Sequence, residues 1–235
     1  MIKYVVVVPA YKHSVLVADA LTSLVRQSEV EALRLVVVDD GCPYPETRDV
    51  VRAFQIAHPG LIHSVRQPNR GLSGARNTGI EVALARWPEA LGIWFLDADN
   101  VLEPWALRRV GEACEADPDA DWFFPDIMGF GVRFLADAAG PYDVIEHLVH
   151  NFCEAGSFVR MRVFEAGVRF DEDMKLGYED WDFWLQAVTH GFRGRYLPDA
   201  GFRYRKRGES MIANSERDHA EIMAYMRRKH RRFFT

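Results

Sequence analysis

Residues 92–100 read GIWFLDADN, an apolar run that ends in two aspartates, Asp97 and Asp99. Apolar segments ordinarily stop on turn residues such as Gly, Asn or Pro rather than on a pair of carboxylates. The D-x-D pattern occurs five times in the chain, but only this copy directly follows a run that could be a buried strand. The surrounding sequence must therefore decide whether these carboxylates form a site.

Similar apolar runs recur before and after this one. The segments KYVVVVP, LRLVVVDDG, LIHSVRQ and DWFFPDI are short, and most of them are rich in β-branched or aromatic residues, which predicts strands. Segments with apolar residues at helical spacing lie between them and predict helices at residues 14–27 (with Ser14 as the cap), 45–58 (with Pro45 near the start), 71–87 and 103–117. This alternation through about residue 125 is typical of parallel strands with crossover helices, and it predicts an open α/β sheet.

The second half of the chain is less regular. Its patterns predict a helix at 140–152, a strand leading into a short helix at 155–168, a helix beginning near Glu179, short strands at 193–198 and 201–206, and a terminal helix at 215–234. No linker, repeat or low-complexity segment divides the sequence. We therefore expect a single domain with two functional halves.

Polar residues follow three of the predicted strands: Pro9-Ala10-Tyr11, Asp39-Asp40 and Asp97-Ala98-Asp99. The carboxyl ends of parallel strands share one edge of a sheet, where open α/β folds bind ligands. Two carboxylates at such an edge suit Mg²⁺ or Mn²⁺, which prefer oxygen ligands and often share them with substrate phosphates. The sequence has neither a glycine-rich Walker loop nor a G-x-G-x-x-G after the first strand, so a diphosphate held by metal and arginine is the simplest remaining ligand.

The composition of the chain indicates its cellular compartment and the kinds of partner that it could bind. Hydrophobic residues make up 49% of the 235 residues, and no apolar stretch reaches the ~20 residues that span a bilayer. The start MIKYVVVVPAY is not typical of a signal peptide, and three widely spaced cysteines predict free thiols in a reducing cytoplasm without structural zinc. The net charge is −5, yet residues 202–235 carry ten Lys or Arg against four Asp or Glu. That basic tail either contacts an anionic partner, such as a membrane surface or another subunit, or is a solvated helix end.

Six motifs in order resemble glycosyltransferase family 2 over nearly all of residues 3–212: VVVVPAYK, VVVDDGCP, NRGLSGARNTGI, LDADN, GYEDWDFWLQAVTHG and YRKRGES. Cys42 stands where serine or threonine is usual in the second motif. The resemblance implies the GT-A fold, with a Rossmann-like, mostly parallel central sheet flanked by helices, a smaller acceptor-side sheet and a C-terminal helix. Residues 1–100 would form the nucleotide-sugar half, 101–212 the acceptor half and 213–235 the basic helix.

The resemblance also implies residue roles. Asp180 would be the catalytic base, with Glu179 helping to place the substrate, and Asp99 would bind Mn²⁺ or Mg²⁺ directly, with Asp97 contacting the ribose or a metal-bound water. The residues expected along a nucleoside-diphosphate sugar, with UDP-sugars favoured, are Pro9, Ala10, Tyr11, Asp40, Asn69, Gly71 and Arg76. The acceptor would be a saccharide, a lipid-linked sugar or another glycan, and no nucleic acid is expected as a partner.

Several alternatives stay open at this stage. Arg207 stands where the family often carries a metal-binding histidine; it either pairs with the diphosphate or lies in solvent. Tyr178, Trp181 and Trp184 either stack on an acceptor sugar or pack in the core. Arg76 could also be a surface arginine, and Asp39-Asp40 could simply cap a turn.

Two rival functions remain. One is a phosphatase with an aspartate nucleophile after a strand. The other is a non-catalytic nucleotide-sugar binding module or the partner subunit of another transferase. The first predicts phosphate release without nucleotide affinity, and the second predicts nucleotide binding without turnover.

Overall fold

The computed structural model describes residues 1–12, 14–131, 135–137, 139–206 and 217–234. The first half contains β1 (Tyr4–Ala10), α1 (Leu16–Val25), η1 (Val30–Ala32), β2 (Leu33–Asp39), α2 (Pro45–Ala57), β3 (Ile62–Arg66), α3 (Gly71–Arg86) and β4 (Gly92–Phe95). The second half contains β5 (Val101–Leu102), α4 (Ala106–Ala116), β6 (Trp122–Pro125), β7 (Ile127–Gly131), β8 (Leu135–Asp137), α5 (Val144–His147), β9 (Phe158–Arg160), α6 (Met161–Glu165), α7 (Glu179–Thr189), β10 (Gly194–Leu197), β11 (Phe202–Lys206), α9 (His219–Lys229) and η2 (Arg231–Phe233).

The central sheet has seven strands in the order β10-β6-β9-β4-β1-β2-β3. Strand β1 pairs in parallel with both β2 and β4, β2 pairs in parallel with β3, and β6 pairs in parallel with β10. Strand β9 runs antiparallel to its neighbours β4 and β6. The predicted mostly parallel α/β sheet is therefore confirmed.

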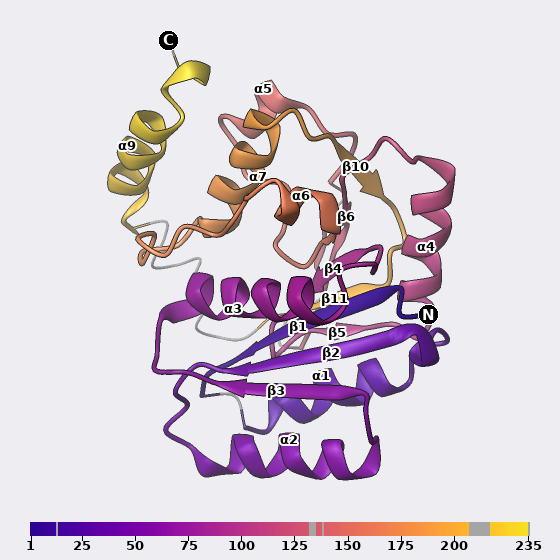
Figure 1. Cartoon of the computed structure of the whole chain (residues 1–235). Coiled ribbons are helices and arrows are strands. Elements are labelled where there is room, and N and C mark those ends of the chain that lie inside the picture. Colours follow the sequence, from indigo (N-terminus) through magenta and orange to yellow (C-terminus); the bar gives the residue numbers. More distant parts are fainter. Residues whose placement is uncertain (13, 132–134, 138, 207–216, 235) are drawn as a thin grey trace.

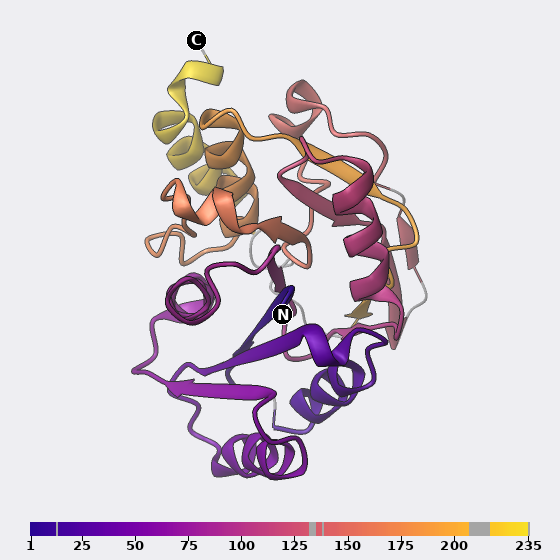
Figure 2. The same ribbon diagram turned by 45° about the vertical axis from the view of Figure 1, so that its right-hand side comes forward.

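Both faces of the sheet are buried, which explains why the strand sequences are continuous apolar runs. On β1, Tyr4, Val6 and Val8 pack into the core beneath α1, α2 and α4, while Val5 and Val7 face the core beneath α3, α6 and α7. Figure 1 shows α3 packed over β1 and β2, between the sheet and the upper part of the molecule that carries α6 and α7. Figure 2 shows α3 nearly end-on, with α2 on the far side of the strands.

A smaller sheet, in the order β5-β11-β7-β8, lies beside the D-x-D turn. The sequence predicted β11 but not β5, β7 or β8. These strands are short, and β7 (IMGFG) contains two glycines, so neither alternation nor a long apolar run marks them. In the described part of the chain, no helix is long and apolar enough to cross a membrane.

Two local predictions were wrong. Ser14 does not cap α1: the position before the helix is Val15, and no side chain caps it. The helix expected at 140–152 is confined to Val144–His147, where Asp143 accepts hydrogen bonds from the backbone N–H groups of Ile145 and Glu146. The three cysteines are free, as expected, and all three are buried.

Candidate active site

The acids at the end of β2 are held by backbone and side-chain donors. Asp40 is 3% exposed, and its carboxylate accepts hydrogen bonds from the backbone N–H groups of Arg70 (2.8 Å) and Gly71 (2.9 Å) and from Gln67 Nε2 (2.7 Å). These backbone groups open α3 and have no partner within the helix. Asp40 therefore anchors the start of α3 at the sheet edge. Its predicted contact with a nucleobase is not tested by these bonds.

Asp39 caps the turn that follows β2, which is the alternative that the sequence left open for the pair Asp39-Asp40. Its carboxylate accepts from Cys42 N (2.7 Å) and pairs with Arg66 (2.5 Å). Gly41 has φ +70, and a Cβ atom there would lie 2.9 Å from Asn69 N, so this turn needs glycine to let residue 69 approach.

The predicted donor residues of the first half lie around this turn. Pro9 and Ala10 are the last residues of β1 and pair with Val38 and Asp39 of β2. Tyr11 is 38% exposed, with Lys12 Nζ 5.0 Å from its ring centroid. Asn69 is exposed, and Gly71 is the first residue of α3 with φ +81. The sheet thus brings these residues to one edge.

Asp97 and Asp99 follow β4 in a turn that is tied to the smaller sheet. Asn100 is 1% exposed, and its side-chain oxygen accepts from Arg205 N (2.9 Å), while Arg205 Nε donates to the carbonyl of Asp99 (2.8 Å). The carboxylates of Asp97 and Asp99 are both partly exposed. Strand β11 therefore fixes the backbone of the D-x-D turn and leaves its acids at the sheet edge.

Arg76 joins this turn to the acid pair of α7. Its guanidinium is 1% exposed, donates to Asp97 (3.0 and 3.3 Å) and Glu179 (2.8 Å), and lies over the ring of Phe170 with 5.1 Å to the centroid. Burial lowers the pKa of Arg76, but the surrounding carboxylates outweigh it and the net shift is upward. The surface-arginine alternative is wrong, because this side chain is in the interior.

The helix α7 begins with the two acids that the sequence singled out. The residue before it, Tyr178, has a left-handed backbone (φ 59), so the chain turns sharply into Glu179 and Asp180. Asp180 is partly buried, and its Oδ1 accepts from its neighbour's backbone, Trp181 N (2.8 Å), and from Asn151 Nδ2 (3.2 Å). The pKa of Asp180 is raised, first by burial and then by the charge of Glu179, while Arg76 acts in the opposite direction. A raised pKa suits a carboxylate that must accept a proton near neutral pH.

A further acid, Glu154, escaped the sequence analysis. It lies just before β9, accepts a hydrogen bond from the backbone N–H of Gly156, and has a pKa raised to about 8 by burial and by the nearby charges of Asp97 and Asp180. Because β9 is antiparallel, its start lies at the same edge as the ends of its neighbours. A prediction that β9 runs antiparallel to its neighbours would have placed Glu154 at this edge of the sheet.

The tryptophans of α7 belong to the core. Trp181 is 3% exposed and donates through Nε1 to the carbonyl of His147 (2.5 Å); Trp184 is 0% exposed, donates to the carbonyl of Cys153 (2.7 Å) and stacks on Trp122. Neither can present a ring face to a sugar, so the acceptor-stacking alternative is wrong for both. Tyr178 is partly exposed, and its hydroxyl contacts His219 Nδ1 of α9 (3.2 Å). Arg207 lies outside the described residues.

The donor set of the D-x-D turn fits a divalent cation that keeps other ligands. Asp97 and Asp99 offer hard carboxylate oxygens, and in the described ranges no group of three or more His, Cys, Asp or Glu could enclose an ion. Mg²⁺ and Mn²⁺ are commonly bound by one or two carboxylates together with substrate phosphates. Asp99 and Asp97 are the residues that could hold such an ion.

Solved structures similar to this chain include glycosyltransferases of the GT-A fold. The chain superposes on "Crystal structure of S. aureus TarS 1-349 in complex with UDP-GlcNAc" with a TM-score of 0.75 and 19% identity, covering 90% of this chain and 61% of that one. It also matches "Mannosyltransferase PcManGT from Pyrobaculum calidifontis in complex with GDP-Man and Mn2+" with a TM-score of 0.70 and 20% identity, covering 90% and 59%. The chain thus has the GT-A fold, and it spans about 60% of the length of these solved chains.

The sequence comparisons identify the family. The model "Glycosyl transferase family 2" matches residues 5–167. The "Succinoglycan biosynthesis protein ExoO" of Rhizobium meliloti is 30% identical over 94% of this chain and 67% of its own length, and ExoW of the same organism is 29% identical over 95% and 75%. The chain belongs to glycosyl transferase family 2, which supports glycosyl transfer and favours it over the phosphatase alternative.

Proposed function

We propose that the chain is an inverting glycosyltransferase that moves a sugar from a nucleoside-diphosphate sugar to an acceptor hydroxyl. The observation that carries this proposal is the buried contact of Arg76 with both Asp97 (3.0 Å) and Glu179 (2.8 Å). It joins the strand end expected to hold the donor to the helix expected to hold the base. This contact supports a single reaction centre with groups for both substrates.

In the proposed reaction the acceptor oxygen attacks the anomeric carbon while the bond from that carbon to the diphosphate oxygen breaks. The bonding electron pair leaves with the nucleoside diphosphate, and the acceptor proton passes to Asp180. Its Oδ1 already accepts hydrogen bonds from Asn151 Nδ2 and Trp181 N, so we assign the proton to Oδ2. Attack opposite the leaving group inverts the anomeric centre through an oxocarbenium-like transition state.

Donor binding is assigned to the sheet edge. Pro9, Ala10, Tyr11 and Asp40 would border the nucleobase, and Asn69 and Gly71 would lie along the rest of the donor, with a UDP-sugar favoured. Asp99 and Asp97 would hold Mn²⁺ or Mg²⁺, which when bound neutralises the charge that develops on the departing diphosphate. Glu179, held by Arg76, helps to place the sugar or the acceptor. Relatives named for succinoglycan biosynthesis favour a saccharide or lipid-linked glycan as the acceptor.

A thermal-shift screen of UDP, GDP, dTDP, CDP and ADP, with and without Mn²⁺, tests the donor site, because a ligand that binds only the folded state raises its melting temperature. One nucleotide should raise the melting temperature, and more so with Mn²⁺. Asp99→Ala should reduce the shift, whereas Asp119→Ala, an exposed aspartate in another D-x-D copy, should not. A flat screen contradicts the proposal. A shift in a wild type that turns over no nucleotide sugar favours the binding-module alternative.

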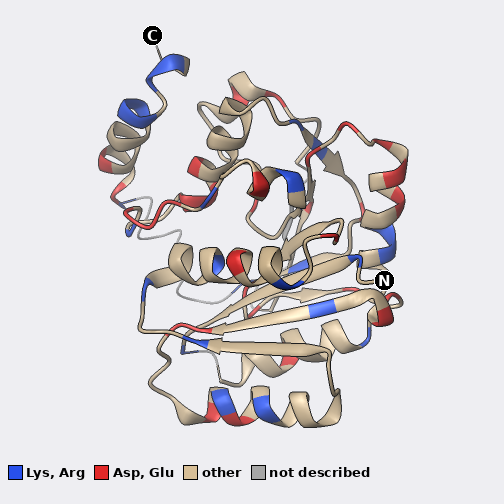
Figure 3. Cartoon of the chain, viewed as in Figure 1, with Lys and Arg blue, Asp and Glu red and all other residues tan. Residues whose placement is uncertain are grey.

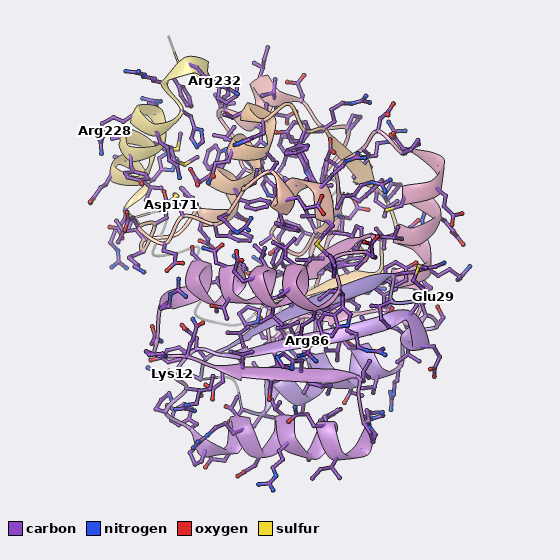
Figure 4. All side chains as sticks on the ribbon, in the orientation of Figure 1. Lys12, Glu29, Arg86, Asp171, Arg228 and Arg232 are labelled. Atoms are coloured by element: carbon purple, nitrogen blue, oxygen red, sulfur yellow. The ribbon has the colours of Figure 1, made fainter. Side chains whose placement is uncertain are left out.

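We further propose a cytoplasmic enzyme that contacts an anionic membrane surface through α9; the exposed basic face of α9 supports the membrane contact. Ile222, Met223 and Met226 of α9 pack against Trp181 and Leu185 of α7. The basic residues Arg227, Arg228, Arg231 and Arg232 are exposed at the far end of the chain, as Figure 3 shows in blue and Figure 4 shows for Arg228 and Arg232. Basic side chains near a surface are attracted to anionic lipids.

Liposome flotation tests this contact. Because removing α9 would expose apolar residues of α7, the sharper variant is Arg228→Gln with Arg232→Gln, compared with Arg48→Gln and Arg52→Gln on exposed positions of α2. The α9 pair should lower binding to phosphatidylserine vesicles, and the α2 pair should not. Equal flotation of both variants and the wild type would remove the membrane proposal.

A further inference from the structure

A row of hydrogen-bonded side chains leads from the loop before α5 to Asp180. The hydroxyl of Tyr142 contacts His147 Nδ1 (3.0 Å), His147 Nε2 contacts Asn151 Oδ1 (3.2 Å), and Asn151 Nδ2 donates to Asp180 Oδ1 (3.2 Å). The first three residues lie in a part of the chain that the sequence motifs do not cover. None of them has a place in the reaction described above.

The imidazole of His147 is enclosed and neutral. It is 0% exposed and lies among aromatic rings, with centroid distances of 4.8 Å to Phe152, 5.3 Å to Tyr142 and 6.3 Å to Trp181. The pKa of His147 is lowered to about 4, chiefly by burial; the hydrogen bond with Asn151 acts in the opposite direction, and the charge of the exposed His150 adds to the lowering. A neutral imidazole has one donor and one acceptor nitrogen, so each of its two contacts must run in one direction.

The charge of Asp180 fixes that direction. In the ionised form in which it acts as a base, Asp180 only accepts hydrogen bonds, so Asn151 then turns its amide NH₂ toward Asp180 and its oxygen toward His147. The oxygen of Asn151 then requires a proton on His147 Nε2, which leaves Nδ1 as the acceptor for the hydroxyl of Tyr142. Burial keeps the pKa of Tyr142 well above its usual value, so the phenol retains its proton to donate. In all three hydrogen bonds, the donor is therefore the group farther from Asp180 along the row and the acceptor is the nearer one.

We propose that Tyr142, His147 and Asn151 are positioning residues that hold Asp180 Oδ1, so that Oδ2 faces the acceptor hydroxyl. The inference rests on the proposed role of Asp180 as base. Charged groups act on Asp180 as well: the charge of Glu179 raises the pKa of Asp180 and that of Arg76 lowers it, whereas the hydrogen bonds to Oδ1 come from Asn151 and the backbone of Trp181. Trp181, which follows Asp180 in α7, also donates to the carbonyl of His147 (2.5 Å). Two hydrogen bonds therefore link the row to the start of α7: one from Asn151 to the carboxylate of Asp180 and one from the Trp181 side chain to the backbone of His147.

Steady-state kinetics of Asn151→Ala test the proposal. The hydrogen bond from Asn151 favours the ionised form of Asp180, so its loss should raise the pKa of Asp180 and move the acidic limb of the kcat profile to higher pH. kcat at neutral pH should fall about tenfold or more, as expected for a lost bond to a charged group, with the donor KM unchanged. An unshifted profile with kcat near the wild type would overturn the proposal.

Tyr142→Phe is the milder variant, because it removes only the hydroxyl and keeps the ring that packs on Trp122. It should lower kcat by a smaller factor than Asn151→Ala. Tyr196→Phe is the matched control: its hydroxyl bonds to Asp126 at the sheet edge and not to this row. Equal effects of the two Tyr→Phe variants would contradict the proposal.

Two measurements separate this inference from the proposed function. Asp180→Asn reports on the base itself: if that variant still transfers sugar, the proposed function fails, whatever Asn151 does. In ¹⁵N-labelled protein, the ring shifts of His147 should show the neutral Nε2–H tautomer at pH 7, and Asn151→Ala should weaken that preference, independently of any activity. An imidazolium or an Nδ1–H tautomer in the wild type would overturn the row.

Discussion

Different groups hold Asp40 in the first half of the molecule and the acid pair Glu179 and Asp180 in the second. In the first half, Asp40 is fixed at a strand end by two backbone N–H groups and one amide side chain. In the second half, Glu179 is fixed by the guanidinium of Arg76 and Asp180 by the amide of Asn151 together with a backbone N–H. The regular βα architecture supplies backbone donors at the sheet edge, whereas the irregular half depends on a few buried side chains. A single side-chain substitution should therefore destabilise the site more in the second half than in the first.

The largest effect is expected from Arg76→Met, which cuts the tie between the halves. It leaves Asp97 and Glu179 without their cationic partner in a mostly buried cluster, and loss of one partner of a buried ion pair costs about 3–5 kcal/mol. Urea unfolding of the variant and the wild type measures this loss. Arg108→Met is the control, because its pair with Glu112 is more than half exposed on both sides, and it should change stability by roughly 0.5 kcal/mol or less. A loss below about 1 kcal/mol for Arg76→Met would show that the halves hold together without it.

A smaller effect is expected from Asp40→Asn in the first half. The amide oxygen still accepts hydrogen bonds, but the new NH₂ group faces a backbone donor at the start of α3, so the cost is that of a weakened bond to a charged group, about 1.5–3 kcal/mol. The same urea titration measures it. Because Asp40 is also predicted to bind the nucleobase, the melting shift with nucleotide should disappear. If the variant is as unstable as Arg76→Met, the backbone-held half is no more robust than the other.

The next effect depends on pH and concerns Glu154. Its pKa in the folded protein, about 8, lies above the ordinary carboxyl value of 4.5. Between roughly pH 5 and pH 8 the folded state therefore holds a proton that the unfolded state has lost, and the free energy of unfolding falls as pH rises through that window. Glu154→Gln removes this contribution, so the variant should match the wild type near pH 5 and exceed it by about 1–3 kcal/mol above pH 8.

Unfolding in metal-free buffer at both pH values tests this, with Glu112→Gln as an exposed control. Parallel curves for Glu154→Gln and the wild type would mean that Glu154 is ionised in the folded protein. In that case the second half of the molecule would carry a further buried charge, balanced by Arg76.

The same division explains how much the sequence could predict. Strands β1, β2 and β4 are continuous apolar runs, and the fold places whatever follows them at one edge, so Asp40, Asp97 and Asp99 could be selected from the pattern. Arg76 could be selected by its motif, but its burial depends on Asp97 and Glu179, which lie 21 and 103 residues further along the chain. Glu154 and Asn151 were missed because their positions follow from the antiparallel direction of β9 and the short length of α5. Neither feature has a sequence period.

The smallest effect is expected from Cys42→Ser in the first half. Cys42 Sγ accepts a hydrogen bond from Lys12 N (3.2 Å) and contacts Thr47 Oγ1 (3.3 Å), so a hydroxyl finds the same partners in the same turn. The gain of stronger hydrogen bonds opposes the loss of the larger sulfur atom from a site that is 1% exposed, and the net change should stay within about 1 kcal/mol. Urea unfolding checks it against Cys153→Ser, where burial in an apolar cluster should make the same substitution more costly. Because the backbone of the β2 turn is already fixed by Asp39 and Gly41, a large loss at Cys42 would show that side chains, and not only backbone donors, hold the first half of the site.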